Sequence, residues 1–263
     1  MNYFNKLFIK IKKAFLIIKN FGIYEFIVFS FYRFFNKEIR DFLYKFLSIF
    51  YNKKIKNFQF NDINELVDFG FKVGIGIIRP TQKRYEILEL LNLLSKRQIS
   101  NVLEIGTENG GTLFFWGKIL KENGILISLD LPLEKNGYGY KEWRSNLFKN
   151  FVKDNQKLFL LRDDSHSFEA LENIKKILNS EKLDFLFIDG DHSYEGVKKD
   201  FEMYSGLVKE GGLIAFHDIV FHSRGGSEVD RFWKEIKNKF NYEEFVDDWN
   251  QDGCGIGVIY YKR

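Results

Sequence analysis

Carboxylates occur at the ends of the apolar runs in the second half of this 263-residue chain. There are five such runs, each short enough for a strand: 102–105, 125–129, 158–161, 185–188 and 213–216. The acidic residues within or just after them are Glu104, Asp130, Asp163, Asp164, Asp189, Asp191 and Asp218. In open α/β sheets, ligands bind beyond the carboxyl ends of the strands. A site with a carboxylate at every strand end repels a pyrophosphate and attracts a cationic ligand or a metal ion.

Strands and helices in alternation are needed to position these carboxylates. Segments of helical spacing, one of them around residues 112–122, separate the five runs, which is typical of crossover units and a parallel sheet. Residues 242–246 and 255–261 follow the last helical segment and predict a closing hairpin. We therefore predict a doubly wound α/β domain over residues 81–263.

A glycine-containing loop, VLEIGTENGGT, follows the first run. Gly106 permits a tight turn from strand to helix, and Gly110 lets a ligand approach the backbone at the helix N-terminus. The loop departs from the G-x-G-x-x-G pattern of dinucleotide binders, because Glu108 stands at the second glycine. Asp130, 24 residues beyond Gly106, is placed to accept the two hydroxyls of a ribose or to end the strand as an ordinary turn residue. The loop and the acidic strand ends both argue against a nicotinamide oxidoreductase.

Five blocks in order along residues 82–263 resemble class I S-adenosylmethionine-dependent methyltransferases: LEIGTENGG, ISLD, DDS, FIDGDHSYEGVKKD and LVKEGGLIAFHD. The last two are most similar to the branch that holds macrocin-type sugar O-methyltransferases and the family named after cephalosporin hydroxylase. The resemblance implies a Rossmann-like fold with a mostly parallel, seven-stranded sheet. It also implies S-adenosylmethionine as cofactor, whose sulfonium and ammonium groups suit acidic strand ends.

The resemblance also assigns the cofactor contacts. The amino-acid part would be held by residues of the first block, and the ribose and adenine by the ends of the next two strands. The residues so implied are Glu104, Gly106, Thr107, Glu108, Gly110, Asp130, Asp164, Ser165 and Asp189.

The same resemblance places the chemistry in FIDGDHSYEG, with Asp189 as a metal ligand and His192, three residues later, as general base. An alcohol that attacks a methyl group must lose its proton, and histidine titrates near neutral pH. A divalent metal on the same oxygen would lower its pKa and orient it. Asp218 would be the second ligand. His217 stands where those relatives carry a carboxylate, so the site suits Mn²⁺ or Fe²⁺ at least as well as Mg²⁺.

Structural roles remain open for each of these residues. Asp189 and Asp191 could cap the helix that follows, and His192 or His217 could be hydrogen-bonded without reacting. The two remaining histidines, His166 and His222, are weaker candidates that face solvent or line the substrate site. Residues 134–143 and 222–228 are predicted to cover the site as loops.

Residues 1–60 differ from the rest of the chain. They hold 12 basic and 3 acidic residues and 14 of the 30 phenylalanines, whereas the other 203 residues hold 28 basic and 33 acidic ones. A stripe from Phe4 to Ile18 predicts an amphipathic helix, and helices at 23–35 and 37–51 are expected to follow. The segment is a cap on the domain or on a second subunit, or it lies on an anionic membrane surface. No nucleic-acid-binding motif accompanies the charge, so we expect no nucleic-acid partner.

The composition excludes several classes of protein. A hydrophobic content of 45% excludes a disordered chain, and a single cysteine, Cys254, excludes a disulfide scaffold and a cysteine-based zinc site. The most apolar stretch, 14–35, is broken by charges, and no signal-peptide cleavage site follows it. We expect a cytoplasmic protein, peripheral to the inner face of a membrane if the basic segment binds lipid. Residues 61–80 are predicted to connect the segment to the domain.

The sequence thus predicts an S-adenosylmethionine-dependent O-methyltransferase. By resemblance, its acceptor is an oxygen of a sugar, nucleotide-sugar or surface-glycan precursor, with Mg²⁺ or Mn²⁺ as a second cofactor. One alternative is a metal-independent methyltransferase in which His192 acts alone. Another is a non-catalytic membrane-surface or assembly module that keeps only the cofactor fold. A homo-oligomer is compatible with each.

Overall fold

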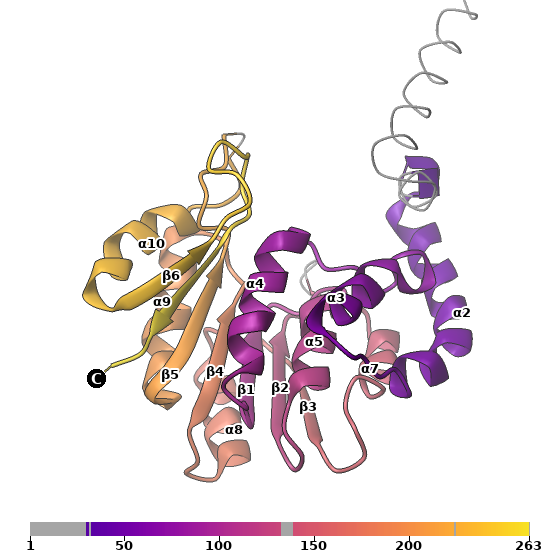
Figure 1. The fold of residues 1–263 in the computed structure, drawn as a ribbon, viewed down its shortest axis with the longest axis horizontal. Coiled ribbons are helices and arrows are strands. Elements are labelled where there is room, and N and C mark those ends of the chain that lie inside the picture. Colours follow the sequence, from indigo (N-terminus) through magenta and orange to yellow (C-terminus); the bar gives the residue numbers. More distant parts are fainter. Residues whose placement is uncertain (1–29, 32, 133–138, 224, 263) are drawn as a thin grey trace, which may run out of the picture.

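A seven-stranded sheet forms the centre of the molecule (Figure 1). The computed structural model describes residues 30–31, 33–132, 139–223 and 225–262. The strand order is β3-β2-β1-β4-β5-β7-β6, with β1 to β5 parallel and β7 antiparallel to both of its neighbours. The strands are β1 Asn101–Ile105, β2 Ile125–Asp130, β3 Lys157–Arg162, β4 Leu183–Ile188, β5 Val208–His217, β6 Asn241–Phe245 and β7 Ile256–Tyr260. The predicted Rossmann-like fold and the closing hairpin are confirmed.

Helices cover both faces of the sheet, so the central strands are buried on both sides. All five residues of β1 are buried, with Val102 in the core of one face and Leu103 in the core of the other. The first face carries α2 Lys37–Lys56, α3 Ile63–Lys72, α4 Arg84–Ser95, α5 Gly111–Ile119 and α7 Trp143–Phe148. The second carries α8 Phe168–Leu178, α9 Tyr194–Tyr204 and α10 Val229–Ile236.

Two elements differ in length from their sequence pattern. The helix predicted to reach residue 122 ends at Ile119, because Leu120 is extended and its carbonyl accepts a hydrogen bond from Gln156 Nε2 at 2.7 Å. Strand β5 begins at Val208, five residues before its apolar run, because Val208 already pairs with Leu183 of β4, and the register then shifts before Leu213 pairs with Phe185. Neither change moves a strand end that carries a predicted site residue.

The N-terminal part of the described chain packs on the first face. Helix α2 confirms the third predicted helix and extends it to Lys56, and Lys118 Nζ donates to the carbonyl of its Ile55 at 2.8 Å. The stripe at 4–18 and most of the helix predicted at 23–35 lie outside the described residues. The segment predicted as a connector contains α3, whose Leu66 and Val67 are buried in the common core. Its division from the neighbouring segments at 60 and 80 stays a prediction.

Within the described ranges, no helix combines the length and the apolar composition that a membrane span requires.

Candidate active site

The carboxyl ends of β1, β4 and β5 lie side by side and bring the central residues together. Ile105 pairs with Ile188, and Ile188 with Phe216, so all three strands end at the same level. The amide of Asp189 donates to the Ile105 carbonyl at 2.8 Å, which fixes the backbone after β4 against the end of β1. Parallel pairing therefore places Asp189, His217 and the glycine loop around one point.

Two glycines in the loop after β1 occupy positions that a side chain would fill. Gly106 has φ +85°, and a Cβ there would lie 2.0 Å from the Asp189 carbonyl oxygen. Gly110 precedes α5 with φ +81°, and its Cβ would lie 2.3 Å from the Phe148 ring. Both positions therefore require glycine, and together they hold the loop close to the β4 end while the first turn of α5 begins. A helix N-terminus in this setting is available for the negative end of a ligand.

Asp130 holds this loop in place. Its Oδ2 accepts hydrogen bonds from the amides of Thr107 at 2.9 Å and Glu108 at 2.8 Å, and its Oδ1 accepts one from Leu131 at 2.7 Å. Burial raises the pKa of Asp130, although the three hydrogen bonds favour its charged form. The structure thus shows the turn-forming role that the sequence left open. A carboxylate has about four lone-pair positions, so a ribose contact by Asp130 stays a prediction.

Glu104 is a buried carboxylate with one unsatisfied oxygen. Its Oε2 accepts from the Trp116 indole at 2.5 Å, and its buried Oε1 has no hydrogen-bond partner among the described residues. Burial raises the pKa of Glu104 to about 8, although the neighbouring threonine hydroxyls and the indole favour the charged form. A buried acceptor without a donor is costly, and the ammonium of an amino-acid ligand supplies one. This oxygen and the glycine loop fit the amino-acid part of S-adenosylmethionine.

The predicted adenine contacts lie in the loop after β3. Asp164 Oδ1 accepts from the His166 amide at 2.8 Å, and the Ser165 carbonyl accepts from the Tyr204 hydroxyl at 2.6 Å. His166 Nε2 lies 3.3 Å from Asp200 Oδ1, so it ties this loop to α9. The loop is well anchored, and the adenine role of Asp164 and Ser165 stays a prediction.

Three of the four histidines meet two aspartates at the ends of β4 and β5. His217 Nδ1 lies 3.0 Å from Asp189 Oδ1 and 3.4 Å from Asp218 Oδ1. The two nitrogens of His192 lie 2.8 Å from Asp218 Oδ2 and 3.4 Å from Asp189 Oδ1. His222 Nε2 is 3.2 Å from Asp218 Oδ1. The structure therefore brings together the predicted base and all three predicted metal ligands, and we call this group the Asp–His cluster.

The cluster fixes the charge of its members. Hydrogen bonds to Asp189 and Asp218 raise the pKa of His192 to about 10, against the opposing effect of burial. Burial disfavours ionisation of Asp189 and Asp218, but the adjacent imidazoles outweigh it and lower the pKa of both. In this arrangement His192 is positively charged at neutral pH and donates hydrogen bonds. A role as base therefore requires that its contacts with the carboxylates change when substrate binds.

His217 Nδ1 lies at a metal-site spacing from both Asp189 and Asp218, but among the described residues only Glu86, His217 and Cys254 form a group with all donor atoms within 4.8 Å of one another. Neighbouring ligands of an octahedral ion with bonds of about 2.1 Å lie about 3 Å apart, close to the 3.0 and 3.4 Å measured from His217 Nδ1. Two carboxylates and an imidazole suit Mn²⁺ or Fe²⁺ as well as Mg²⁺. Ion pairs between charged histidines and aspartates account for the same contacts, so the metal stays a proposal.

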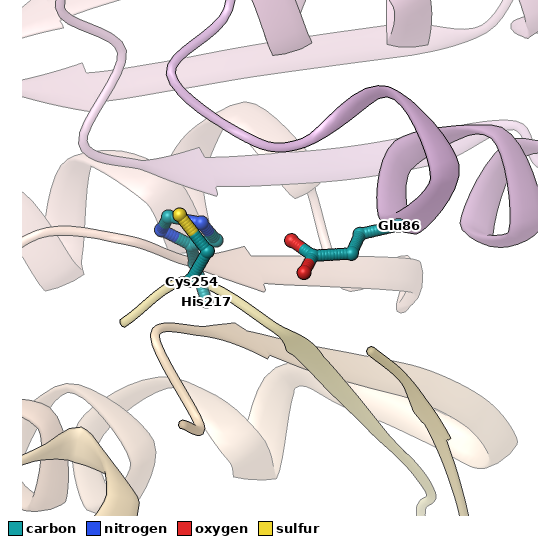
Figure 2. A group of neighbouring side chains, drawn as sticks. All are labelled: Glu86, His217 and Cys254. Atoms are coloured by element: carbon teal, nitrogen blue, oxygen red, sulfur yellow. The ribbon is translucent and has the colours of Figure 1, made fainter. Parts of the chain in front are cut away.

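The far side of His217 faces a second group. One donor atom each from Glu86, His217 and Cys254 lie within 4.8 Å of one another, and Figure 2 shows the Glu86 carboxylate directed toward the other two. The buried Nε2 of His217 has no hydrogen-bond partner within the described part of the chain. Glu86 is held by Gln251 Nε2 at 2.7 Å and the Gly255 amide at 2.9 Å. Glu86 and Cys254 thus lie beside His217, while its Nδ1 contacts the aspartates.

Sequence reasoning missed two of these polar side chains. Gln82 Nε2 donates to Asp189 Oδ2 at 2.7 Å, across 107 residues of sequence, and no local pattern marks it. Glu86 left a signal, because it precedes Leu90 and Leu94 by four and eight residues and so interrupts a buried apolar stripe. A fully buried glutamate in such a stripe indicates a polar partner elsewhere in the fold.

Of the two loops predicted to cover the site, one is described nearly in full. The Glu228 amide donates to the His192 carbonyl at 2.7 Å, and His222 joins the Asp–His cluster, so 222–228 lies beside the site. Residues 133–138 of the other loop lie outside the described residues. Tyr140, at its end, is buried, and burial raises its pKa to about 12.

The comparison with known proteins identifies the central part of the chain. Residues 103–219 match the family model described as a methyltransferase domain. This segment therefore resembles a methyltransferase domain. The match begins in β1 and ends just after β5, so every predicted cofactor, catalytic and metal residue lies inside the matched segment.

Two curated relatives each match about half of the chain. An uncharacterized protein of Acanthamoeba polyphaga mimivirus is 36% identical over 147 residues, 53% of this chain and 61% of the relative. Tapetum-specific methyltransferase 1 of Arabidopsis thaliana is 30% identical over 141 residues, 52% of this chain and 54% of the relative. The matched stretches thus span little more than half the length of these relatives.

Solved structures share the fold of this chain. An O-methyltransferase from Bacillus cereus, solved in complex with SAH, has a TM-score of 0.50 at 19% identity, covering 75% of this chain and 91% of its own. TomG from Streptomyces achromogenes, an O-methyltransferase solved in complex with SAM, has a TM-score of 0.51 at 14% identity. The match covers 76% of this chain and 89% of TomG. The fold is therefore that of S-adenosylmethionine-dependent O-methyltransferases.

Proposed function

We propose that this protein transfers the methyl group of S-adenosylmethionine to an oxygen of a sugar, nucleotide-sugar or surface-glycan precursor. The observation that supports the cofactor is the buried carboxylate of Glu104 in β1, whose Oε1 has no donor among the residues that the structure describes. The matched methyltransferase domain and the cofactor complexes of the structural neighbours support it. The acceptor class rests on the sequence resemblance to macrocin-type sugar O-methyltransferases.

The chain's own residues divide the work in this proposal. Glu104 and the loop from Gly106 to Gly110 bind the amino-acid part of the cofactor, which supplies the methyl group. The Asp–His cluster lies at the carboxyl ends of β4 and β5, beside β1, and binds the acceptor hydroxyl. Once substrate separates His192 from at least one carboxylate, the imidazolium releases its proton to solvent, and the neutral imidazole then takes the proton of that hydroxyl. Gln82 and His217 keep Asp189 oriented during this step.

Calorimetric titration with S-adenosylmethionine tests the cofactor, with NAD as the control ligand. We expect micromolar binding of S-adenosylmethionine and none of NAD, because the acidic strand ends repel a pyrophosphate. Turnover is then measured with the bound cofactor and a panel of nucleotide sugars, by the release of S-adenosylhomocysteine. Absence of S-adenosylmethionine binding would contradict the proposed function.

Substitution of Glu104 by glutamine is expected to weaken S-adenosylmethionine binding about tenfold and to remove its pH dependence. With a pKa of about 8, Glu104 is mostly protonated at pH 6, and a bound ammonium favours the charged form. Affinity of the unmodified chain should therefore rise with pH between 6 and 7.5, by up to about tenfold per unit. The window stops there because an α-amino group itself titrates near pH 8. An equal pH slope in E104Q would show that Glu104 does not face the cofactor.

Metal assistance is the second part of the proposal. Asp189, His217 and Asp218 would hold a divalent cation, which supplies Lewis-acid stabilisation of the acceptor oxygen. We expect the chain to bind Mn²⁺ in a titration followed by electron paramagnetic resonance, and D218N to lose this binding. D191N is the matched control, because Asp191 follows the same strand but caps Ser193 of the next turn. Equal turnover before and after chelation would favour the metal-independent alternative.

A further inference from the structure

Helix α2 has apolar side chains on two opposite sides. One side is buried against the domain through Tyr44, Ser48 and Ile55, with Leu47 and Tyr51 partly buried beside them. At 3.6 residues per turn, the opposite side consists of Ile39, Phe42, Phe46, Ile49 and Phe50. We call these five residues the outer face of α2. Packing on the domain accounts for the apolar residues of the first side. The outer face stays exposed among the described residues.

The outer face lies where the exposed large hydrophobic side chains of the described chain are concentrated. Phe42 is 71% exposed and Ile49 68%, and the rings of Phe46 and Phe50 pack edge to face with centroids 5.1 Å apart. Seven of the twelve exposed large hydrophobic side chains among the described residues fall between positions 34 and 50. Figure 1 places α2 at the outer margin of the molecule, away from the sheet. An apolar patch this concentrated marks an interaction surface.

Basic residues border this face on both sides. Lys45 and Lys56 lie along one edge of the helix and Lys54 along the other, and Lys53 continues the face itself. Residues 1–60 hold 12 basic and 3 acidic residues. A two-fold contact with a second copy would place this positive segment against itself, which like-charge repulsion opposes. An anionic partner is complementary to both the lysines and the charge of the preceding sequence.

We propose that the outer face of α2 binds an anionic membrane surface. Helices with one aromatic and aliphatic face and flanking lysines lie in the plane of the interface, with the rings among the headgroups and the ammonium groups near the phosphates. The domain would then be held at the membrane by α2. The inference is independent of the proposed function, because it uses no residue of the site.

Sedimentation with vesicles tests this inference on the full chain. The vesicles contain equal parts of phosphatidylcholine and phosphatidylglycerol, with pure phosphatidylcholine as the neutral control. We expect the chain to bind the anionic vesicles, and high salt to weaken this binding. The double variant F46S/F50S is expected to bind about tenfold more weakly, because it removes the aromatic pair from the interface.

The matched control is F168S/W249S, since Phe168 and Trp249 are exposed to a similar degree on other parts of the surface. It should bind the vesicles as the unmodified chain does, and melting curves check that both variants are folded. Equal binding by F46S/F50S, or equal binding to neutral vesicles, would overturn the proposal. An absence of vesicle binding would also overturn it. A dimer that F46S/F50S dissociates would in that case assign the outer face to a second copy of the chain.

Discussion

Substitution of Gly106 by alanine is expected to abolish S-adenosylmethionine binding. The Cβ of alanine would lie 2.0 Å from the Asp189 carbonyl oxygen and 2.5 Å from its carbonyl carbon, and both are backbone atoms that no rotamer change can move. The φ of +85° adds strain of about 1 kcal/mol or more. The loop or the end of β4 must therefore shift, and each carries residues of the site. Calorimetric titration should detect no binding in G106A, and melting temperature should fall.

Gly211 provides the control for backbone strain alone. It has φ +72°, but a Cβ there would meet nothing within 4 Å. G211A should therefore lose stability on the order of 1 kcal/mol and keep its affinity for S-adenosylmethionine. If G106A and G211A bind the cofactor equally well, the close approach of Gly106 to the β4 end has no part in forming the cofactor site.

Much of the site could be predicted because its residues follow strands. Parallel strands end at the same edge of a sheet. Asp189 follows one apolar run, and His217 and Asp218 follow another, so these three residues are expected to lie close together. The glycine loop was predictable for the same reason, since a turn from strand to helix needs positive φ at Gly106. These inferences depend on local sequence and on one rule of topology.

Contacts across elements, and the charges they set, could not be predicted. Gln82 reaches Asp189 from a turn before α4, which no periodicity indicates. Histidine at position 192 predicted a base that titrates near neutral pH, whereas two carboxylates hold its pKa at about 10. That shift depends on both ring nitrogens facing an aspartate, a property of the packed site. The outer face of α2 shows the same limit, because periodicity predicts an apolar helix but not which side the domain covers.

Substitution of His192 by glutamine is expected to lower turnover by about a hundredfold to ten-thousandfold, with affinity for S-adenosylmethionine nearly unchanged. Glutamine keeps a polar side chain near Asp218 but cannot accept and release the acceptor's proton. His192 contacts Asp189 and Asp218 and none of the glycine loop, so cofactor binding should not depend on it. Single-turnover methyl transfer and calorimetry on the same sample separate the two effects.

H166Q is the control for the loss of a histidine paired with an aspartate. His166 contacts the buried Asp200, and this contact joins the β3 loop to α9 outside the Asp–His cluster. Its substitution should lower the melting temperature and retain most of the turnover. If H192Q keeps full turnover, His192 neither accepts the proton nor orients the acceptor, and Asp189, with its pKa held low by two imidazoles, becomes the group that orients the acceptor hydroxyl. If H192Q loses cofactor affinity instead, the cluster supports the cofactor site through Asp189, whose carbonyl oxygen would lie 2.0 Å from a Cβ at Gly106.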